Sequence, residues 1–154
     1  MEVGLMRRQW IQYIEGLIHE GTLDGQYLQL LQLQDESNPT FVSEVVTLFF
    51  EDTEELLNKL RIAISQPPVD FKKIDDHVHQ LKGSSSSIGA LRVKNACIDF
   101  RSACEQQSPD WCSRCLQQVE QEFYGVKEKL SYLYAQLEKR ILNAGGSIPA
   151  DLSF

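Results

Sequence analysis

Apolar side chains recur every three or four positions along most of the chain, which is the spacing that places them on one face of an α-helix. No segment shows the alternation of apolar and polar residues that is typical of a half-buried β-strand. The pattern therefore predicts an all-α protein. We expect six helices, which run approximately over Trp10–Glu20, Tyr27–Gln34, Pro39–Ser65, Phe71–Ile88, Arg92–Gln107 and Pro109–Ile141.

Capping residues support several of these boundaries. Asn38-Pro39 and Ser108-Pro109 each combine a side chain that can accept a hydrogen bond from a helix N-terminus with a proline suited to the first helical position. Asp70 has the same capping position before the fourth helix. Gly89 follows the last apolar residue of that helix, so we expect it to close or kink the helix.

The four longer helices are joined by short connections, which favours an antiparallel four-helix bundle. The last helix carries the longest apolar seam, with spacings of three and four over about seven turns. The two helices before residue 38 are additional N-terminal elements that cap or extend the bundle. We expect one helical domain over residues 1–144, followed by a flexible C-terminal tail over residues 145–154.

Composition and charge restrict the classes of partner. The 154 residues carry a net charge of −7, which argues against nucleic acid because phosphate backbones are bound by clustered Lys and Arg side chains. No apolar run approaches the roughly 18 residues of a membrane span, and the N-terminal residues lack the apolar core of a signal peptide. We expect a protein of the cytoplasm and nucleus, with a monomer as the simplest state.

Four cysteines lie in the second half of the chain, at Cys97, Cys104, Cys112 and Cys115. In a reducing compartment we expect them to be thiols that are buried or partly buried in the core. Cys112 and Cys115 have the CxxC spacing of redox motifs and of half zinc sites, so a metal or redox role is the alternative. No second CxxC or His pair lies nearby, which favours the structural interpretation.

The candidate chemistry lies in the fourth predicted helix, where residues 79–90 read HQLKGSSSSIGA. At about 100° per residue, His79 lies away from the apolar stripe and is expected to face solvent, with Lys82 and Ser86 on the same surface. An imidazole can accept a phosphoryl group, and a lysine ammonium can neutralise phosphoryl oxygens. Gly83 costs about 1 kcal/mol relative to alanine in a helix interior. We interpret it as bare backbone that gives a partner access to the imidazole.

The neighbouring residues suggest no separate chemistry. His77 lies on the flank of the stripe and is expected to be a half-buried packing residue, because side chains at i and i+2 do not face each other. The serines at 84–87 have no triad context and no Gly-x-Ser-x-Gly elbow, so a catalytic serine is disfavoured. Ser86 is a candidate for orienting the ring. The sequence contains no P-loop or kinase glycine-rich loop, so we do not expect self-phosphorylation with ATP.

Residues 79–90 resemble the signature of histidine-containing phosphotransfer (HPt) proteins. Arg92–Cys97 and Asp99–Arg101 are similar to the stand-alone plant members of cytokinin-type phosphorelays, and the resemblance covers nearly the whole chain before the tail. It implies that His79 receives a phosphoryl group from the receiver domain of a hybrid histidine kinase and passes it to a response regulator. It also implies that the receiver domain supplies Mg²⁺, so that this chain needs no cofactor or metal.

One position departs from the pattern of many relatives outside plants. Those proteins have a glutamine 22 positions after the histidine, which helps to orient the ring, whereas this chain has Arg101. The guanidinium of Arg101 is a candidate contact for phosphoryl oxygens or for the partner protein.

Two other classes of function compete with a relay. An adaptor that binds receiver domains without phosphoryl turnover keeps the bundle and an exposed apolar patch, but it does not depend on His79. A metal-dependent bundle hydrolase is disfavoured because the sequence lacks the Glu-x-x-His pairs of di-iron bundles. The sequence favours the relay, in which the chain is a phosphoryl carrier rather than an enzyme.

Overall fold

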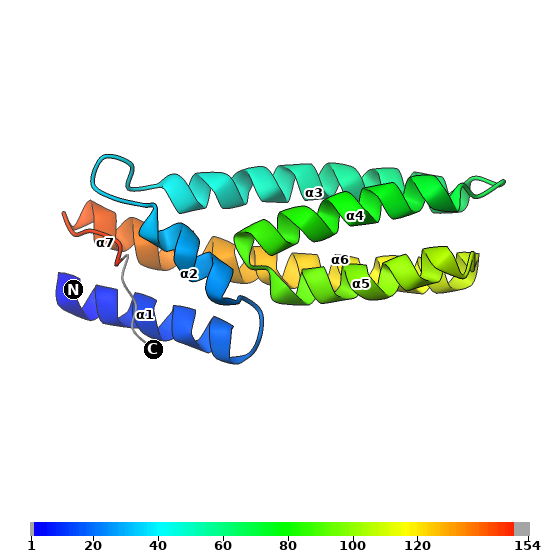
Figure 1. Cartoon of the computed structure of the whole chain (residues 1–154). Coiled ribbons are helices and arrows are strands. Elements are labelled where there is room, and N and C mark those ends of the chain that lie inside the picture. The colour runs from blue at the N-terminus through cyan, green and yellow to red at the C-terminus, as the bar shows by residue number, and fades with distance from the viewer. Residues whose placement is uncertain (1, 150–154) are drawn as a thin grey trace.

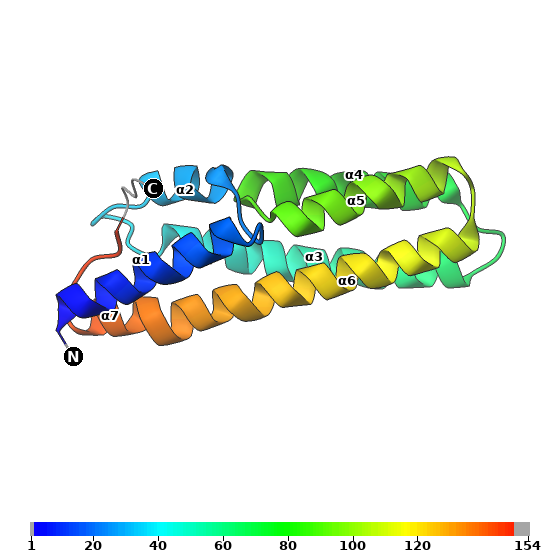
Figure 2. The same ribbon diagram turned by 90° about the horizontal axis from the view of Figure 1, so that it is seen from below.

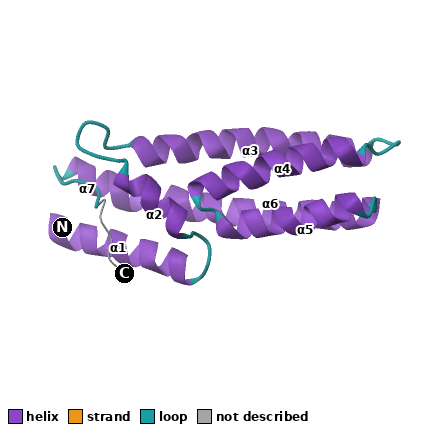
Figure 3. Cartoon of the chain, in the orientation of Figure 1, coloured by secondary structure: helices purple, strands orange, loops and turns teal. Residues whose placement is uncertain are grey.

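The structure is a computed structural model, which describes residues 2–149. These residues form helices and no strands, and the one β-type pairing among them is an isolated bridge between Asp35 and Asn38. None of the described helices is both long and apolar enough to cross a membrane. The elements, coloured by type in Figure 3, are α1 (Val3–His19), α2 (Gly25–Gln32), α3 (Phe41–Ser65), α4 (Phe71–Ile88), α5 (Leu91–Glu105), α6 (Pro109–Tyr132), the π-helical segment η1 (Leu133–Glu138) and α7 (Lys139–Asn143).

Helices α3, α4, α5 and α6 form the antiparallel bundle that the sequence predicts. Each helix packs on the next, and α6 also packs on α3, so the four helices close around one core (Figure 1). Near its centre, Phe49 and Phe50 of α3 meet Phe123 of α6 edge-on, with ring centroids 5.8 and 6.0 Å apart. The predicted fold class is confirmed.

The two N-terminal helices extend the bundle beyond the ends of α4 and α5. Helix α1 packs against η1 and α7, which continue α6, while α2 contacts α4. Figure 2 shows α1 running beside the orange end of this long helix, with α2 in line with the pair α4 and α5. Helix α1 begins at Val3, earlier than the predicted Trp10, and the added turns include the partly buried Met6.

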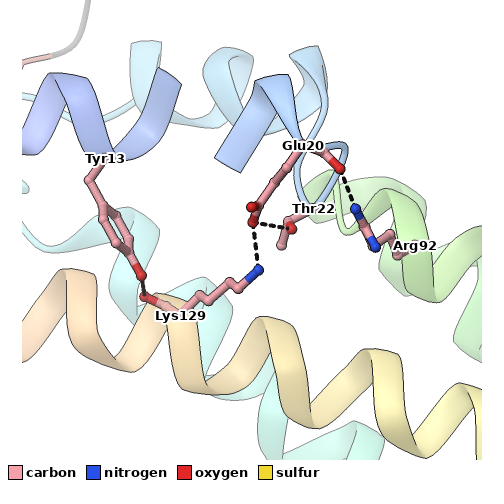
Figure 4. A network of polar contacts seen from close by, with 5 residues as sticks. All are labelled: Tyr13, Glu20, Thr22, Arg92 and Lys129. Atoms are coloured by element: carbon pink, nitrogen blue, oxygen red, sulfur yellow. Dashed lines mark hydrogen bonds and ion pairs between the residues drawn. The ribbon is translucent and has the colours of Figure 1, made fainter. Parts of the chain in front are cut away.

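A polar network fixes the end of α1 to the bundle (Figure 4). The Glu20 carboxylate accepts hydrogen bonds from Lys129 Nζ at 2.6 Å and from Thr22 Oγ1 at 2.7 Å. The Glu20 carbonyl oxygen accepts a hydrogen bond from the guanidinium of Arg92, at the start of α5. The Tyr13 hydroxyl donates to the Lys129 carbonyl oxygen at 3.0 Å. These contacts set the turn between α1 and α2 against α5 and α6.

Three predicted helix boundaries are confirmed in atomic detail. The Asp70 and Ser108 side chains cap α4 and α6 by accepting hydrogen bonds from backbone nitrogens three residues later, at 3.1 and 3.2 Å. Gly89 ends α4 in the left-handed region, with φ of 82°. A Cβ at Gly89 would lie 2.7 Å from the backbone nitrogen of Tyr27. Glycine therefore permits both the turn and the close approach of α2.

The predicted start of α3 at Asn38-Pro39 is wrong, because α3 begins at Phe41. Asp35 Oδ1 accepts hydrogen bonds from the backbone nitrogens of Ser37 and Asn38 at 2.9 and 3.1 Å, which closes a turn before the helix. Asn38 belongs to this turn, and Pro39 follows it outside the helix. A competing local hydrogen bond therefore moves the helix start by two residues.

The long last helix contains a π-helical segment, η1, which the apolar periodicity does not predict. The seam continues through it, because Leu133, Leu137 and Ile141 are all buried. Glu138 is buried as well, with 6 % of its surface exposed, and its Oε1 accepts a hydrogen bond from Trp10 Nε1 at 3.3 Å. Burial raises the pKa of the Glu138 carboxyl to about 7. This carboxyl is a polar contact between α1 and the end of the bundle.

All four cysteines are free and buried, as predicted. Burial raises the pKa of the Cys97 and Cys104 thiols to about 12. Within residues 2–149, no group of three or more His, Cys, Asp or Glu side chains is arranged to hold a metal ion.

The predicted division into a domain over residues 1–144 and a flexible tail over residues 145–154 stays a prediction. Helix α7 ends at Asn143, and Gly145 follows with φ of 81°. Ile148 packs against the core. Residues 150–154 lie outside the described part of the chain.

Candidate functional site

Helix α4 exposes His79 on its solvent side, where the angular analysis places it. The flanking apolar residues Val78 and Leu81 are fully buried, while His79 is exposed. His77 is half-buried, as predicted. Its burial lowers the pKa of the imidazole, and two nearby lysine charges add to this effect. The two histidines therefore have different environments, and His79 is the one open to a partner.

One nitrogen of the His79 ring is contacted by Arg101, which reaches over from α5. Arg101 Nη1 lies 3.0 Å from His79 Nδ1. The same guanidinium contacts Asp75 on α4, with Nε 3.0 Å from Oδ1 and Nη2 3.4 Å from Oδ2. Asp75, Arg101 and His79 thus form a chain of contacts across the α4–α5 interface. Nε2 is the ring nitrogen that lies outside this chain of contacts.

Asp75 is a residue of this site to which the sequence alone assigns no role. The signal was the spacing of four residues, which brings the two side chains together on a helix surface. The contact with Arg101 could not be found in this way, because 26 residues separate Asp75 from Arg101. That contact depends on how α4 packs against α5.

Lys82 lies one turn after His79 and is half-buried. Its charge acts on the buried thiol of Cys97, where it opposes the rise in the thiol's pKa that burial causes. Within the described part of the chain, no carboxylate forms an ion pair with the Lys82 ammonium. Its predicted role, stabilising the charge of a phosphoryl group, stays a prediction.

Gly83 gives α4 a bare stretch of backbone next to the imidazole. The residue is exposed, and a Cβ added there would meet nothing within 4 Å. Packing among the residues that the structure describes therefore does not require glycine at position 83. This agrees with the interpretation that a partner approaches here, and the access role of Gly83 stays a prediction.

The four serines after Gly83 divide into three environments. Ser84 and Ser87 donate hydrogen bonds to carbonyl oxygens of the preceding turn at 3.1 and 3.0 Å. Ser85 is fully buried on the core side. Ser86 is exposed, but seven residues separate it from His79, about 10 Å along the helix axis. The ring contact in this structure comes from Arg101, and the predicted orienting role of Ser86 stays a prediction.

Some apolar side chains on the helices around α4 are exposed. Ile98 lies one turn before Arg101 on α5 and is 43 % exposed. Leu33, which follows the last turn of α2, is 64 % exposed. Such side chains are candidates for docking a partner. Periodicity could not select them, because it does not separate the apolar residues that the fold buries from those that it leaves exposed.

Comparison with known proteins shows the class to which this fold and site belong. Residues 44–142 match the family model described as the Hpt domain, which covers most of the chain and includes all of α4 and α5. The chain therefore belongs to the Hpt domain family, and the resemblance read from residues 79–90 is confirmed.

Individual relatives match over nearly the full length. Over 138 residues, the chain is 63 % identical to histidine-containing phosphotransfer protein 1 of Arabidopsis thaliana, which covers 90 % of this chain and 89 % of that protein. The crystal structure of a histidine-containing phosphotransfer protein from Medicago truncatula has a TM-score of 0.86 and 48 % identity, covering 92 % of this chain and 96 % of that one.

The same comparison finds a protein with a different name. Pseudo histidine-containing phosphotransfer protein 6 of Arabidopsis thaliana is 45 % identical over 137 residues, covering 88 % of this chain and 89 % of that protein. Overall similarity thus extends to proteins that are named apart from the histidine-containing ones. Support for phosphotransfer by this chain therefore comes from His79 and its surroundings.

Proposed function

We propose that this chain is a phosphoryl carrier of a phosphorelay. His79 accepts a phosphoryl group from an aspartate in the receiver domain of a hybrid histidine kinase and passes it to an aspartate of a response regulator. The observation that carries the proposal is the exposed imidazole of His79, whose Nδ1 contacts Arg101 while Nε2 lies outside that contact. In the first step, Nε2 loses its proton and forms the N–P bond as the P–O bond to the aspartate breaks, with the two in line, and the aspartate leaves as a carboxylate. The second step reverses this exchange on the next aspartate.

The two proteins share the stabilisation of the transferred charge. The receiver domain supplies Mg²⁺, and this chain supplies the Lys82 ammonium, one turn from the imidazole. Gly83 lets the partner's backbone come close to the ring. In this scheme the chain carries the group without a cofactor and without a turnover reaction of its own. A monomeric state and a location in the cytoplasm and nucleus go with the proposal and rest on the sequence.

The experiment is transfer from a receiver domain that carries a labelled phosphoryl group. Wild type, His79→Gln and His19→Gln are compared, since His19 is also exposed but lies on α1. We expect label on wild type and on His19→Gln, and none on His79→Gln. The label should be lost in acid and kept in alkali, as expected of a phosphorus–nitrogen bond.

Two results would contradict the proposal. Label on His79→Gln at the wild-type level would assign the chemistry to another residue. Binding of the receiver domain by wild type with no label transferred would instead show an adaptor, the competing function that the similarity to phosphotransfer proteins does not favour.

A further inference from the structure

The chemistry of arginine determines which atom donates and which accepts in the hydrogen bond between Arg101 and the His79 ring. A guanidinium carries hydrogen-bond donors and no acceptor, so in the contact of 3.0 Å between Arg101 Nη1 and His79 Nδ1 the ring nitrogen must accept. A neutral imidazole has one donor and one acceptor nitrogen. The contact therefore assigns the proton of the neutral ring to Nε2 and the lone pair to Nδ1.

Asp75 holds the guanidinium in the position that makes this contact. It lies four residues before His79 on α4, so its carboxylate and the imidazole share one helix face. The two carboxylate oxygens of Asp75 accept hydrogen bonds from Nε and Nη2 of Arg101, so that Nη1 points at the imidazole ring of His79. The hydrogen bond to Asp75 raises the pKa of the Arg101 guanidinium, so it stays a charged donor. Bidentate pairing of this kind fixes orientation as well as distance.

The same contact matters once the ring carries phosphate. A phosphoryl group on Nε2 is lost to water when a water oxygen bonds to phosphorus and the N–P bond breaks, with the electron pair of that bond returning to Nε2. If Nδ1 first takes a proton from solvent, the ring leaves as neutral imidazole with its proton on Nδ1. Without that proton it must leave as an anion, which is a poor leaving group. A lone pair on Nδ1 that already accepts from a cation is a poor acceptor for a proton.

We propose that Asp75 and Arg101 form a positioning pair that keeps protons off His79 Nδ1 and so protects a phosphoryl group on Nε2 from loss to water. The inference rests on the proposed function, since it concerns the same histidine. It also has a consequence for loading. Nε2 needs a free lone pair to attack phosphorus, so its proton must leave and Arg101 must release Nδ1 to receive it. The pair therefore favours holding the group over exchanging it until a partner displaces the guanidinium.

The test uses phosphoramidate, a small phosphoryl donor, so that loading does not depend on any receiver domain. Wild type, Arg101→Gln, Arg101→Lys and Asp75→Asn are loaded, freed of donor and kept at one neutral pH, while phosphorus NMR follows the loss of phosphohistidine. Arg8→Gln, an exposed arginine on α1, is the matched control. In parallel, nitrogen NMR of labelled histidine reads the tautomer of the unphosphorylated ring, with His79→Gln used to assign its signals.

We expect the Nε2–H tautomer in wild type and phosphohistidine loss about tenfold faster in Arg101→Gln, as for the removal of one charge-assisted hydrogen bond. Glutamine can accept from Nδ1–H, so the tautomer should change in that variant. Arg101→Lys should restore part of the protection, Asp75→Asn should lie between wild type and Arg101→Gln, and Arg8→Gln should match wild type.

Equal half-lives of phosphohistidine in wild type and Arg101→Gln would overturn the proposal, as would an Nδ1–H tautomer in wild type. An Asp75→Asn variant as stable as wild type would remove Asp75 from the pair. Failure of a receiver domain to label the protein would count against the proposed function, but it would leave this assay readable. The two ideas can therefore fail separately.

Discussion

Gly83 occupies a middle position of α4, where its missing Cβ would face open space. Helix propensity favours alanine at such a site, and no contact among residues 2–149 explains the glycine. Lys82, its neighbour, brings a cation to the same face without a carboxylate partner among residues 2–149. At the scale of single residues, these two positions are better explained by the needs of a docked partner than by those of the fold.

Replacing Gly83 with alanine should therefore separate stability from function. We expect Gly83→Ala to raise the free energy of unfolding by up to about 1 kcal/mol, because the helix propensity improves. Transfer from a receiver domain should slow by about tenfold, or about 1.4 kcal/mol in the transfer barrier, because the methyl group enters the docking surface. Urea unfolding and rapid-mixing transfer measure the two effects. Gly125→Ala on α6, also open at its Cβ position, should stabilise without slowing transfer. If Gly83→Ala accepted the phosphoryl group at the wild-type rate, the proposed role of Gly83 in giving a partner access would be contradicted.

Removing the charge of Lys82 should affect transfer and spare the fold. We expect Lys82→Ala to slow phosphoryl transfer by about a hundredfold, the usual cost of losing one group that stabilises a developing charge. The midpoint of thermal unfolding should change little. Lys139→Ala, an exposed lysine on α7, is the control and should transfer at the wild-type rate. If Lys82→Ala also transferred at that rate, the charge would have to come wholly from the receiver domain.

At the scale of elements, the last long helix shows how tertiary burial changes what periodicity predicts. The spacing of its apolar residues anticipates one continuous α-helix, whereas the structure inserts η1 and places Glu138 in the core beside Trp10. The buried carboxyl holds its proton more tightly than it would in water, with a pKa of about 7. Its ionisation is therefore linked to the stability of the packed end of the bundle.

This linkage predicts how stability depends on pH. The folded pKa of Glu138 is raised above its ordinary value of 4.5, so its contribution is complete below pH 4.5 and declines as pH rises towards 7. We expect Glu138→Gln, which keeps an acceptor for Trp10, to flatten the fall in stability between these pH values. Urea unfolding at a series of pH values measures it, with the exposed Glu128→Gln as control. Parallel curves for wild type and Glu138→Gln would contradict the raised pKa.

The elements also show where sequence reasoning succeeds and where it does not. Asp70, Ser108 and Gly89 act through backbone groups a few residues away, so their roles could be predicted from local sequence. The start of α3 was misplaced because the Asp35 side chain competes for the same backbone region. The exposure of His79 followed from helix geometry, but its contact with Arg101 required the packing of α4 on α5, which no local pattern encodes.

At the scale of the whole molecule, α1 and α2 continue the bundle along its length (Figure 1). His79 lies on α4, where Arg101 of α5 contacts it. Two kinds of contact attach α1. The Trp10 indole is fully buried, whereas the ion pair between Glu20 and Lys129 has both side chains about two-fifths exposed, at 41 % and 42 %. A buried indole and an exposed ion pair contribute very differently to the free energy of unfolding.

The attachment of α1 should therefore depend on Trp10 more than on the ion pair. We expect Trp10→Ala to lower the free energy of unfolding by about 3–5 kcal/mol, as for other large buried aromatic residues, and Lys129→Gln by less than about 1 kcal/mol. Trp10→Phe, which keeps part of the packing, should lie between them. Guanidinium unfolding gives the totals, and amide exchange in α1 shows where the loss occurs. A larger loss from Lys129→Gln than from Trp10→Ala would reverse this order.

The reactivity of the buried thiols should report how often the bundle opens around them. All four cysteines lie on α5 and α6 and are buried, and Cys97 and Cys112 are fully buried while these two helices stay paired. A thiol-reactive compound in solution should therefore modify Cys97 and Cys112 only in those molecules whose bundle has opened around α5 and α6, at a rate set by how often this happens. Arg101 lies on α5 between Cys97 and Cys104, but its contact with His79 crosses to α4, so only an opening that separates α5 from α4 withdraws the guanidinium. The reactivity of the core thiols thus reports how often α5 leaves its place in the bundle.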